Sequence, residues 1–285
     1  MREDFAVFIL CHGNPDRVLT WESLDKCKYQ GKRYIILDDE DKTIEGYQKK
    51  FGKDRCLIFS KEEYAKKVDA MDNLNYRKCA VFARNACYDL ARQVGVKYFC
   101  QIDDDMVDIA YRTVINGEVK RTRCYSVDAL FDALIKFLDT NSNFYSVAIA
   151  QPGDYVGGIN SGAIKKKYWR KTMNFWMCDV DKPLKFNGTL NDDVNTFTYN
   201  GTQGKIFLTV PGIMQDQPQT QSTGGGMADA YTVMNTYNKS FRTVMLCPSC
   251  VKVAAFHNSV YPRIHHKIYT ENAYPKIISD RFKVK

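Results

Sequence analysis

Short, unbroken runs of apolar residues that end in polar or acidic residues dominate the first half of the chain. Residues 5–10, 33–37 and 98–102 show no polar alternation, which predicts strands that are covered on both faces. Apolar residues at spacings of three and four predict helices over residues 18–27 and 80–92. This order of strands and helices indicates βαβ units and therefore an α/β fold with parallel strands.

The second half continues with elements of both kinds. Residues 126–138 have the pattern of an amphipathic helix, and we expect Ser126 to cap it, just as Asp16 or Thr20 could cap the helix of residues 18–27. Residues 145–150 and 251–256 read as strands, and residues 57–59 are a further candidate. Further helices are expected from Val194 onward and near Asp229.

Three consecutive carboxylates, Asp103, Asp104 and Asp105, follow the strand predicted over residues 98–102. Because adjacent carboxylates repel one another, a fold tolerates them at a strand end mainly where a cation neutralises them. Hard oxygen ligands suit Mg²⁺ or Mn²⁺, and ligands of α/β sheets bind at the carboxyl ends of the strands. The alternative, a solvated acidic turn, remains open on these residues alone.

A second group of acids, Asp38, Asp39 and Asp41, follows the strand of residues 33–37. Such acids can bind the hydroxyls of a ribose or the edge of a base, whereas a solvated loop is the alternative and is favoured for Asp41. Arg84 lies near the start of a predicted helix, where a guanidinium can reach a phosphate or a base carbonyl.

The composition restricts the possible partners and the location of the protein only a little. The 285-residue chain carries a net charge of +8, which is consistent with a polyanionic partner but also with a solvated basic face. No apolar run is long enough to cross a bilayer, so we expect no membrane partner. Ten scattered cysteines and an N-terminus that leads directly into a strand, without a signal peptide, predict reduced thiols and a cytoplasmic protein.

Taken in order, these motifs resemble the nucleotide-sugar half of GT-A glycosyltransferases. More closely, the chain resembles the DNA-modifying glycosyltransferases of tailed phages, described as TET-associated, which glycosylate 5-hydroxymethylated pyrimidines. The matching residues are His12–Asp16, Thr20, Asp38–Asp41, Asp69–Asn73, Ala83–Asn85 and Asp103–Asp105. One departure is Asn14, where relatives are expected to carry an arginine.

The resemblance implies a GT-A-like, Rossmann-like fold with a mixed, mostly parallel sheet flanked by helices. Residues 1–285 would form a single domain, with a nucleotide-sugar-binding half over residues 1–125 and an acceptor-binding and catalytic half over residues 126–285. It also implies that Mn²⁺ or Mg²⁺ is held by Asp103 and Asp105, with His257 completing the metal shell. The residues expected to contact the donor are His12, Gly13, Arg17, Asp38, Asp39, Arg84, Asp103 and Asp104.

An acidic pair, Asp192 and Asp193, stands before the helix that is expected from Val194. GT-A enzymes place such a pair here, and the resemblance makes Asp193 the base that deprotonates the acceptor, with Asp192 beside it or in contact with the donor. The alternative is that Asp192 only caps the helix.

The activity implied by the resemblance is transfer of a sugar from a UDP-sugar to the hydroxyl of 5-hydroxymethylcytosine in phage DNA. Arabinose is favoured and glucose is possible. The expected partners are the nucleotide sugar and hydroxymethylated double-stranded DNA in the host cytoplasm, with no obligate protein partner. Two alternatives stay open: a GT-A enzyme acting on protein or polysaccharide, and a non-catalytic DNA-binding module, against which the intact acidic motifs argue.

Overall fold

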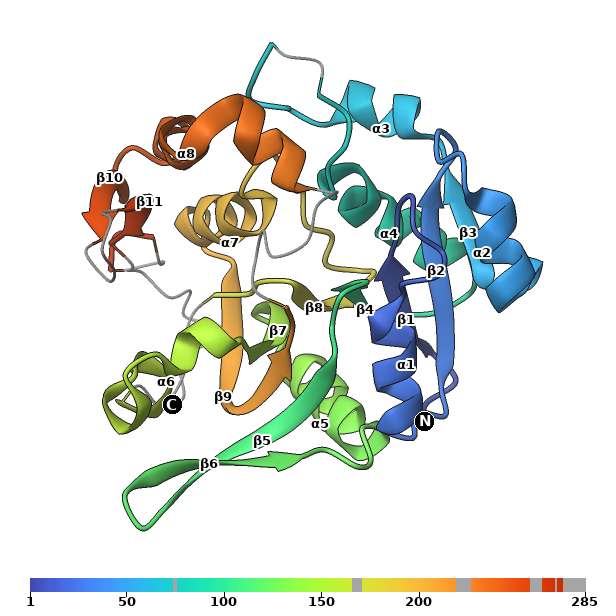
Figure 1. The fold of residues 1–285 in the computed structure, drawn as a ribbon, viewed down its shortest axis with the longest axis horizontal. Helices are drawn as coiled ribbons and strands as arrows, with labels where there is room; N and C mark the ends of the chain where they lie inside the picture. Colours follow the sequence, from blue (N-terminus) through green and yellow to red (C-terminus); the bar gives the residue numbers. More distant parts are fainter. Residues whose placement is uncertain (74–75, 166–170, 219–226, 257–262, 270, 274–285) are drawn as a thin grey trace.

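A mixed nine-stranded sheet forms the centre of the molecule, and helices cover both of its faces (Figure 1). The computed structural model describes residues 1–73, 76–165, 171–218, 227–256, 263–269 and 271–273. Within them, the strand order of the large sheet is β3-β2-β1-β4-β8-β7-β9-β5-β6, and β10 and β11 form a separate hairpin. The strands are β1 Phe5–Leu10, β2 Lys32–Asp38, β3 Cys56–Phe59, β4 Tyr98–Asp103, β5 Asp108–Ile115, β6 Glu118–Arg123, β7 Phe144–Ala150, β8 Phe175–Asp179, β9 Ile206–Asp216, β10 Val251–Phe256 and β11 Arg263–Ile268. The helices are α1 Leu19–Lys26, α2 Ile44–Phe51, α3 Lys61–Lys67, α4 Val81–Gln93, α5 Asp128–Thr140, α6 Gly162–Lys165, α7 Asp192–Thr202 and α8 Met227–Leu246, with short 3₁₀ turns η1 Lys53–Arg55, η2 Pro152–Tyr155 and η3 Gly158–Asn160.

The first four strands in the order of the sheet, β3, β2, β1 and β4, are parallel. All six residues of β1 are buried, as its unbroken apolar run predicts. Phe5, Val7 and Ile9 pack in one core with apolar residues of α1, α2 and α5. Ala6 and Phe8 pack in the other core with residues of α3, α4 and α7. The α/β fold class with helices on both faces of the sheet is therefore confirmed.

Beyond β4 the sheet becomes mixed. β8 is antiparallel to both β4 and β7, whereas β9 is parallel to β7 and antiparallel to β5. The hairpin of β5 and β6 turns at Asn116 and Gly117, which have φ angles of 52° and 77°. An Asn-Gly pair adopts such angles at little cost, so the sequence carried a turn signal at this hairpin. No helix in the described part of the chain is both long and apolar enough to span a membrane.

Two predicted helix caps are wrong. Thr20 lies inside α1, which starts after Val18 and has no side-chain cap, so neither Asp16 nor Thr20 caps it. Ser126 precedes α5 by two positions, and Val127, which cannot accept a hydrogen bond through its side chain, occupies the N-cap. Tertiary contacts determine where these helices begin.

Candidate active site

Two acidic motifs that are far apart in the sequence meet at one buried arginine. Arg84, on α4, is 2% exposed. Its Nη2 donates to Asp103 Oδ1 at the end of β4 (2.8 Å), and its Nε donates to Asp192 Oδ2 at the start of α7 (2.7 Å). The guanidinium thus joins the carboxylates predicted to bind a metal to the pair predicted to contain the base. Its remaining nitrogen, Nη1, is buried and has no partner among the described residues, so this is the atom left for a ligand.

The turn that carries Asp103, Asp104 and Asp105 is held in place by α1. Thr20 Oγ1 donates to the carbonyl oxygen of Asp103 (2.5 Å) and accepts from the backbone N–H of Met106 (3.0 Å). The backbone N–H of Thr20 also donates to the carbonyl of Asp104 (3.0 Å). The function of Thr20 is therefore to fix the acidic turn rather than to cap α1.

The electrostatics of the turn favour a bound cation. The pKa of Asp104 is raised to about 7, mainly by burial and in addition by the neighbouring charges of Asp103 and Asp105. Burial and the charge of Asp103 raise the pKa of Asp105 to about 6. All three acids are half-buried, so the turn is not a fully solvated one, and a divalent cation would relieve the repulsion between their carboxylates.

The donor set fits a magnesium- or manganese-type ion that is shared with a substrate. In the part of the chain that the structure describes, no three His, Cys, Asp or Glu side chains converge as a complete metal cage. Mg²⁺ needs only one or two carboxylates when phosphates and waters supply the other ligands. Asp103 Oδ2 accepts no hydrogen bond from the part of the chain that the structure describes, and Asp105 is the other predicted ligand. His257, the predicted third ligand, lies outside the described residues.

Asp192 and Asp193 begin α7 without capping it. The N-cap residue is Asn191, at φ 56°, and its side chain makes no capping bond. Instead, Asn191 Nδ2 donates to the carbonyl of Lys239 (2.8 Å) and to Thr243 Oγ1 (3.1 Å), both on α8. Because Asp192 accepts from Arg84, the interpretation of Asp192 as a simple helix cap is wrong. Burial, together with the charge of Asp192, raises the pKa of Asp193 to about 6.

Asn85, the neighbour of Arg84, positions the loop that leads into α7. Its Nδ2 donates to the carbonyl of Phe186 (3.0 Å), and its Oδ1 accepts from the N–H of the same residue (3.1 Å). This two-bond contact imitates the pairing of a strand and fixes residues 185–187 against α4.

The predicted motif of residues 69–73 supports the same loop from the other side. The carbonyl of Asp69 accepts from the N–H of Gly188 (2.8 Å). Asp72 Oδ2 accepts from Thr189 Oγ1 and from Arg242 Nη1, each at 2.7 Å. These residues hold the backbone that presents Asp192 and Asp193, which is a role that the sequence alone did not reveal.

The acids after β2 mostly form hydrogen bonds within the protein. Asp38 is buried, with Oδ2 2.9 Å from His12 Nδ1 and Oδ1 accepting from Lys61 Nζ (3.2 Å). His12 and Lys61 outweigh the effect of burial and lower the pKa of Asp38. Asp41 is also buried and accepts from the N–H of Gly13 (2.8 Å), so the solvated-loop interpretation of Asp41 is wrong. Asp39 is exposed, and its Oδ1 accepts from the N–H of Lys61 (2.9 Å).

His12, Gly13 and Arg17 lie exposed in the loop between β1 and α1, at the carboxyl edge of the parallel strands. Arg17 is near enough to the acidic turn to lower the pKa of Asp104 and Asp105, against the larger effect of burial. The loop therefore stands beside the predicted metal site, and the contacts of these three residues and of Asp39 with a donor stay predictions.

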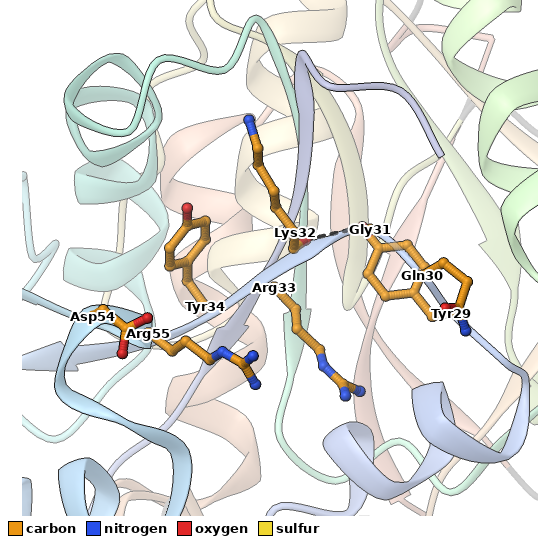
Figure 2. A pocket seen from close by; sticks show the side chains of 8 residues that line it. All are labelled: Tyr29, Gln30, Gly31, Lys32, Arg33, Tyr34, Asp54 and Arg55. Atoms are coloured by element: carbon orange, nitrogen blue, oxygen red, sulfur yellow. Dashed lines mark hydrogen bonds between the residues drawn. The ribbon is translucent and has the colours of Figure 1, made fainter.

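A separate hollow lies at the other end of β2. It is lined by residues 29–34, Asp54 and Arg55, and Figure 2 shows the side chains of Arg33 and Arg55 extending toward the same side of it. Because β2 begins at Lys32 and ends at Asp38, this hollow is at the amino end of the strand. It contains none of the site residues predicted from the sequence.

Comparison with known proteins finds matches to a family model and to solved structures. No curated protein sequence matches it. Among solved structures, glucosyl-3-phosphoglycerate synthase from Mycobacterium tuberculosis in complex with Mg²⁺ and UDP is 8% identical, with a TM-score of 0.48 over 93% of this chain and 87% of that one. The complex of that synthase with Mn²⁺, UDP-glucose and phosphoglyceric acid is 11% identical, with a TM-score of 0.48 over 92% of this chain and 89% of that one. The model of the TET-associated glycosyltransferases, in contrast, matches residues 5–226, so the chain belongs to the TET-associated glycosyltransferase family.

Proposed function

We propose that this glycosyltransferase is metal-dependent and transfers a sugar from a UDP-sugar to the hydroxyl of 5-hydroxymethylcytosine in phage DNA. The observation that carries the proposal is the bridge from Asp103 through Arg84 to Asp192, which brings a cation site and a candidate base together. Arabinose is the favoured sugar and glucose the second choice. The reaction would take place in the host cytoplasm.

On the donor side, Asp103 and Asp105 would hold the cation, which as a Lewis acid neutralises the leaving diphosphate. Arg84 Nη1 is buried beside these acids and can donate to a donor phosphate oxygen. His12, Gly13, Arg17 and Asp39 would complete the donor contacts from the loops after β1 and β2. Asp38 would act mainly by holding His12 in place.

On the acceptor side, Asp193 would accept the proton of the attacking hydroxyl. With a pKa of about 6, Asp193 is mostly ionised at neutral pH and is a stronger base than an ordinary carboxylate. Asp192 would keep Asp193 in position through its bond to Arg84. A proton acceptor so placed fits direct attack by the acceptor hydroxyl on the anomeric carbon.

Support for a DNA acceptor comes from the family, whose name associates these enzymes with TET proteins, and from the net charge of +8. A positively charged protein binds DNA phosphates without regard to sequence. The reacting base would be flipped out of the duplex so that its exocyclic hydroxyl can reach the donor.

The test is to incubate hydroxymethylated duplex DNA with the enzyme, Mn²⁺ and a panel of UDP-sugars, and to analyse the nucleosides by mass spectrometry. A pentose or hexose increment on 5-hydroxymethylcytosine identifies acceptor and donor together. The matched control is the same duplex with unmodified cytosine, which offers no hydroxyl. UDP-sugar hydrolysis without any glycosylated DNA would refute DNA as the acceptor, and it would favour a protein or polysaccharide acceptor.

A further inference from the structure

The β5–β6 hairpin extends beyond the sheet as a free arm. β5 pairs with β9 only over residues 108–111, whereas its pairing with β6 continues to Ile115 and Glu118. Figure 1 shows the hairpin projecting away from the body of the molecule. We call residues 112–122 the arm. Val114 and Ile115, next to the turn, are 47% and 50% exposed.

One face of the hairpin concentrates arginines. Arg112 stands directly opposite Arg121 in the antiparallel register, and Arg123 is two residues further along the same strand. Like charges that face each other across a ribbon destabilise it, and Asp108, which accepts from both Arg121 and Arg123, offsets part of this cost. Asp108 and Asp216, at the base, hold Arg121 at 2.5 and 2.7 Å. They fix the direction of the ribbon. Arg112 is half-buried and donates to Met214 Sδ (3.4 Å), whereas Lys120 is exposed near the turn, where it pairs with Glu118.

The arm is also tied closely to the predicted metal site. β5 begins three residues after Asp105, and the N–H of Val107 donates to the carbonyl of Asp216 (2.9 Å). Because β5 runs directly from the acidic turn into the arm, a molecule bound at the arm has a fixed position relative to the acids, with the tip of the arm roughly 23 Å along the strand from Asp108.

Further exposed apolar residues lie on the η2–η3 segment, whose turn η3 contacts β6. There, Val156 is 72% exposed and Ile159 is 39% exposed. The guanidinium of Arg112 lies 5.2 Å from the ring centre of Tyr155 and links the two parts. We call the arm and this segment together the arm surface, which carries both basic and apolar side chains.

We propose that this surface grips the duplex that carries the acceptor base, an inference that rests on the proposed DNA acceptor. A two-stranded ribbon fits the major groove of B-DNA. Basic side chains on such a ribbon can contact phosphates, and the exposed apolar residues Val114 and Ile115, one on each face of the ribbon, can contact the base edges in the groove. A second copy of this chain is the less suitable occupant, because it carries the same net charge of +8 and because Lys120 and Arg121 on the edge strand oppose strand pairing.

The test compares the triple variant Val114→Ser/Ile115→Ser/Lys120→Ser with the wild-type enzyme at saturating UDP-sugar. We expect the KM for hydroxymethylated duplex DNA to rise about tenfold, or ~1.4 kcal/mol. Turnover of 5-hydroxymethyl-2′-deoxycytidine monophosphate and the KM for the UDP-sugar should stay within about twofold, because neither needs a duplex grip. The Kd for unmodified duplex without any donor provides a second measurement that does not depend on turnover, and it should rise by the same factor.

A matched control is Ile58→Ser/Lys66→Ser. Ile58 is 40% exposed on β3, at the opposite edge of the sheet, and Lys66 pairs with an acid on its own element as Lys120 does. This control should leave duplex KM and Kd unchanged. If the wild-type enzyme modifies duplex DNA and the arm variant keeps its duplex KM and Kd, the inference is overturned. Equal losses on the mononucleotide and the duplex would also overturn it. If the wild-type enzyme does not use duplex DNA at all, the proposed function itself fails.

Discussion

Replacing Arg84 with Met should cost this protein much more stability than an ordinary arginine replacement. Met keeps most of the packing of the side-chain stem but leaves Asp103 and Asp192 without their shared cation. Removing one partner of a buried pair costs about 3–5 kcal/mol. Since the side chains of Asp103 and Asp192 are 32% and 16% exposed, water relieves part of this repulsion, and we expect about 3 kcal/mol. In a domain of this size, that corresponds to a fall in Tm of roughly 6–12 °C.

The assay is chemical unfolding in EDTA, repeated with Mn²⁺. Arg92→Met is the matched control on the same helix, because the Arg92–Asp89 pair is 50% and 61% exposed and should contribute about 1 kcal/mol or less. Mn²⁺ should restore part of the stability of Arg84→Met, because a bound cation neutralises the acids that the arginine no longer compensates. If Arg84→Met lowers the free energy of unfolding no more than Arg92→Met does, the bridging role of Arg84 is refuted.

Three further outcomes are expected from the acids. Asp105→Asn should abolish sugar transfer and weaken Mn²⁺-dependent UDP binding, measured by titration, while calorimetry in EDTA should give a Tm equal to or higher than that of the wild type. Full activity of the wild-type enzyme in EDTA would contradict a metal site. Asp193→Asn should lower turnover about 10²- to 10⁴-fold with little change in donor or DNA affinity, in steady-state kinetics with Asp192→Asn as the milder comparison. The folded-state pKa values of Asp104 and Asp105 lie near 7 and 6, above the ordinary 3.8. Between about pH 4 and pH 7 the metal-free folded protein therefore binds more protons than the unfolded chain, and its Tm should fall as the pH rises through this range. Asp105→Asn should flatten this slope, and a Tm independent of pH would contradict the burial of these acids.

The strands β1 and β4 and the helices α4 and α5 could be predicted from the sequence because each is buried along a whole face. β1 was predicted with both of its observed ends, and α4 and α5 were placed to within two residues. The β5–β6 hairpin was missed, since an arm with both faces exposed has no need of apolar alternation. β8 was missed as well: its apolar run, Phe175–Asp179, is short and lies between strands that come from distant parts of the chain.

The candidate site was predictable in its residue types but not in its connections. Nothing in the spacing of Arg84, Asp103 and Asp192 shows that one guanidinium bonds both acids, because the fold alone brings residues 108 positions apart into contact. The same applies to Asp41, whose surrounding polar sequence suggests solvent, although Gly13 and Thr43 enclose it. Helix starts were also misjudged, because the buried residues Val18 and Val127 occupy the N-cap positions without a side-chain capping bond.

Several residues of the family motif are best understood as supports for the acids. Thr20 fixes the backbone of the acidic turn, and Asn85 fixes the backbone that leads to Asp192. Arg84 then sets the separation of the two acidic groups through two hydrogen bonds of 2.7 and 2.8 Å. Carboxylates that repel one another would move apart without such supports, and a proton acceptor displaced by even 1 Å loses much of its effect on the rate. Arg84 is therefore the residue that couples the position of Asp103 to that of Asp192.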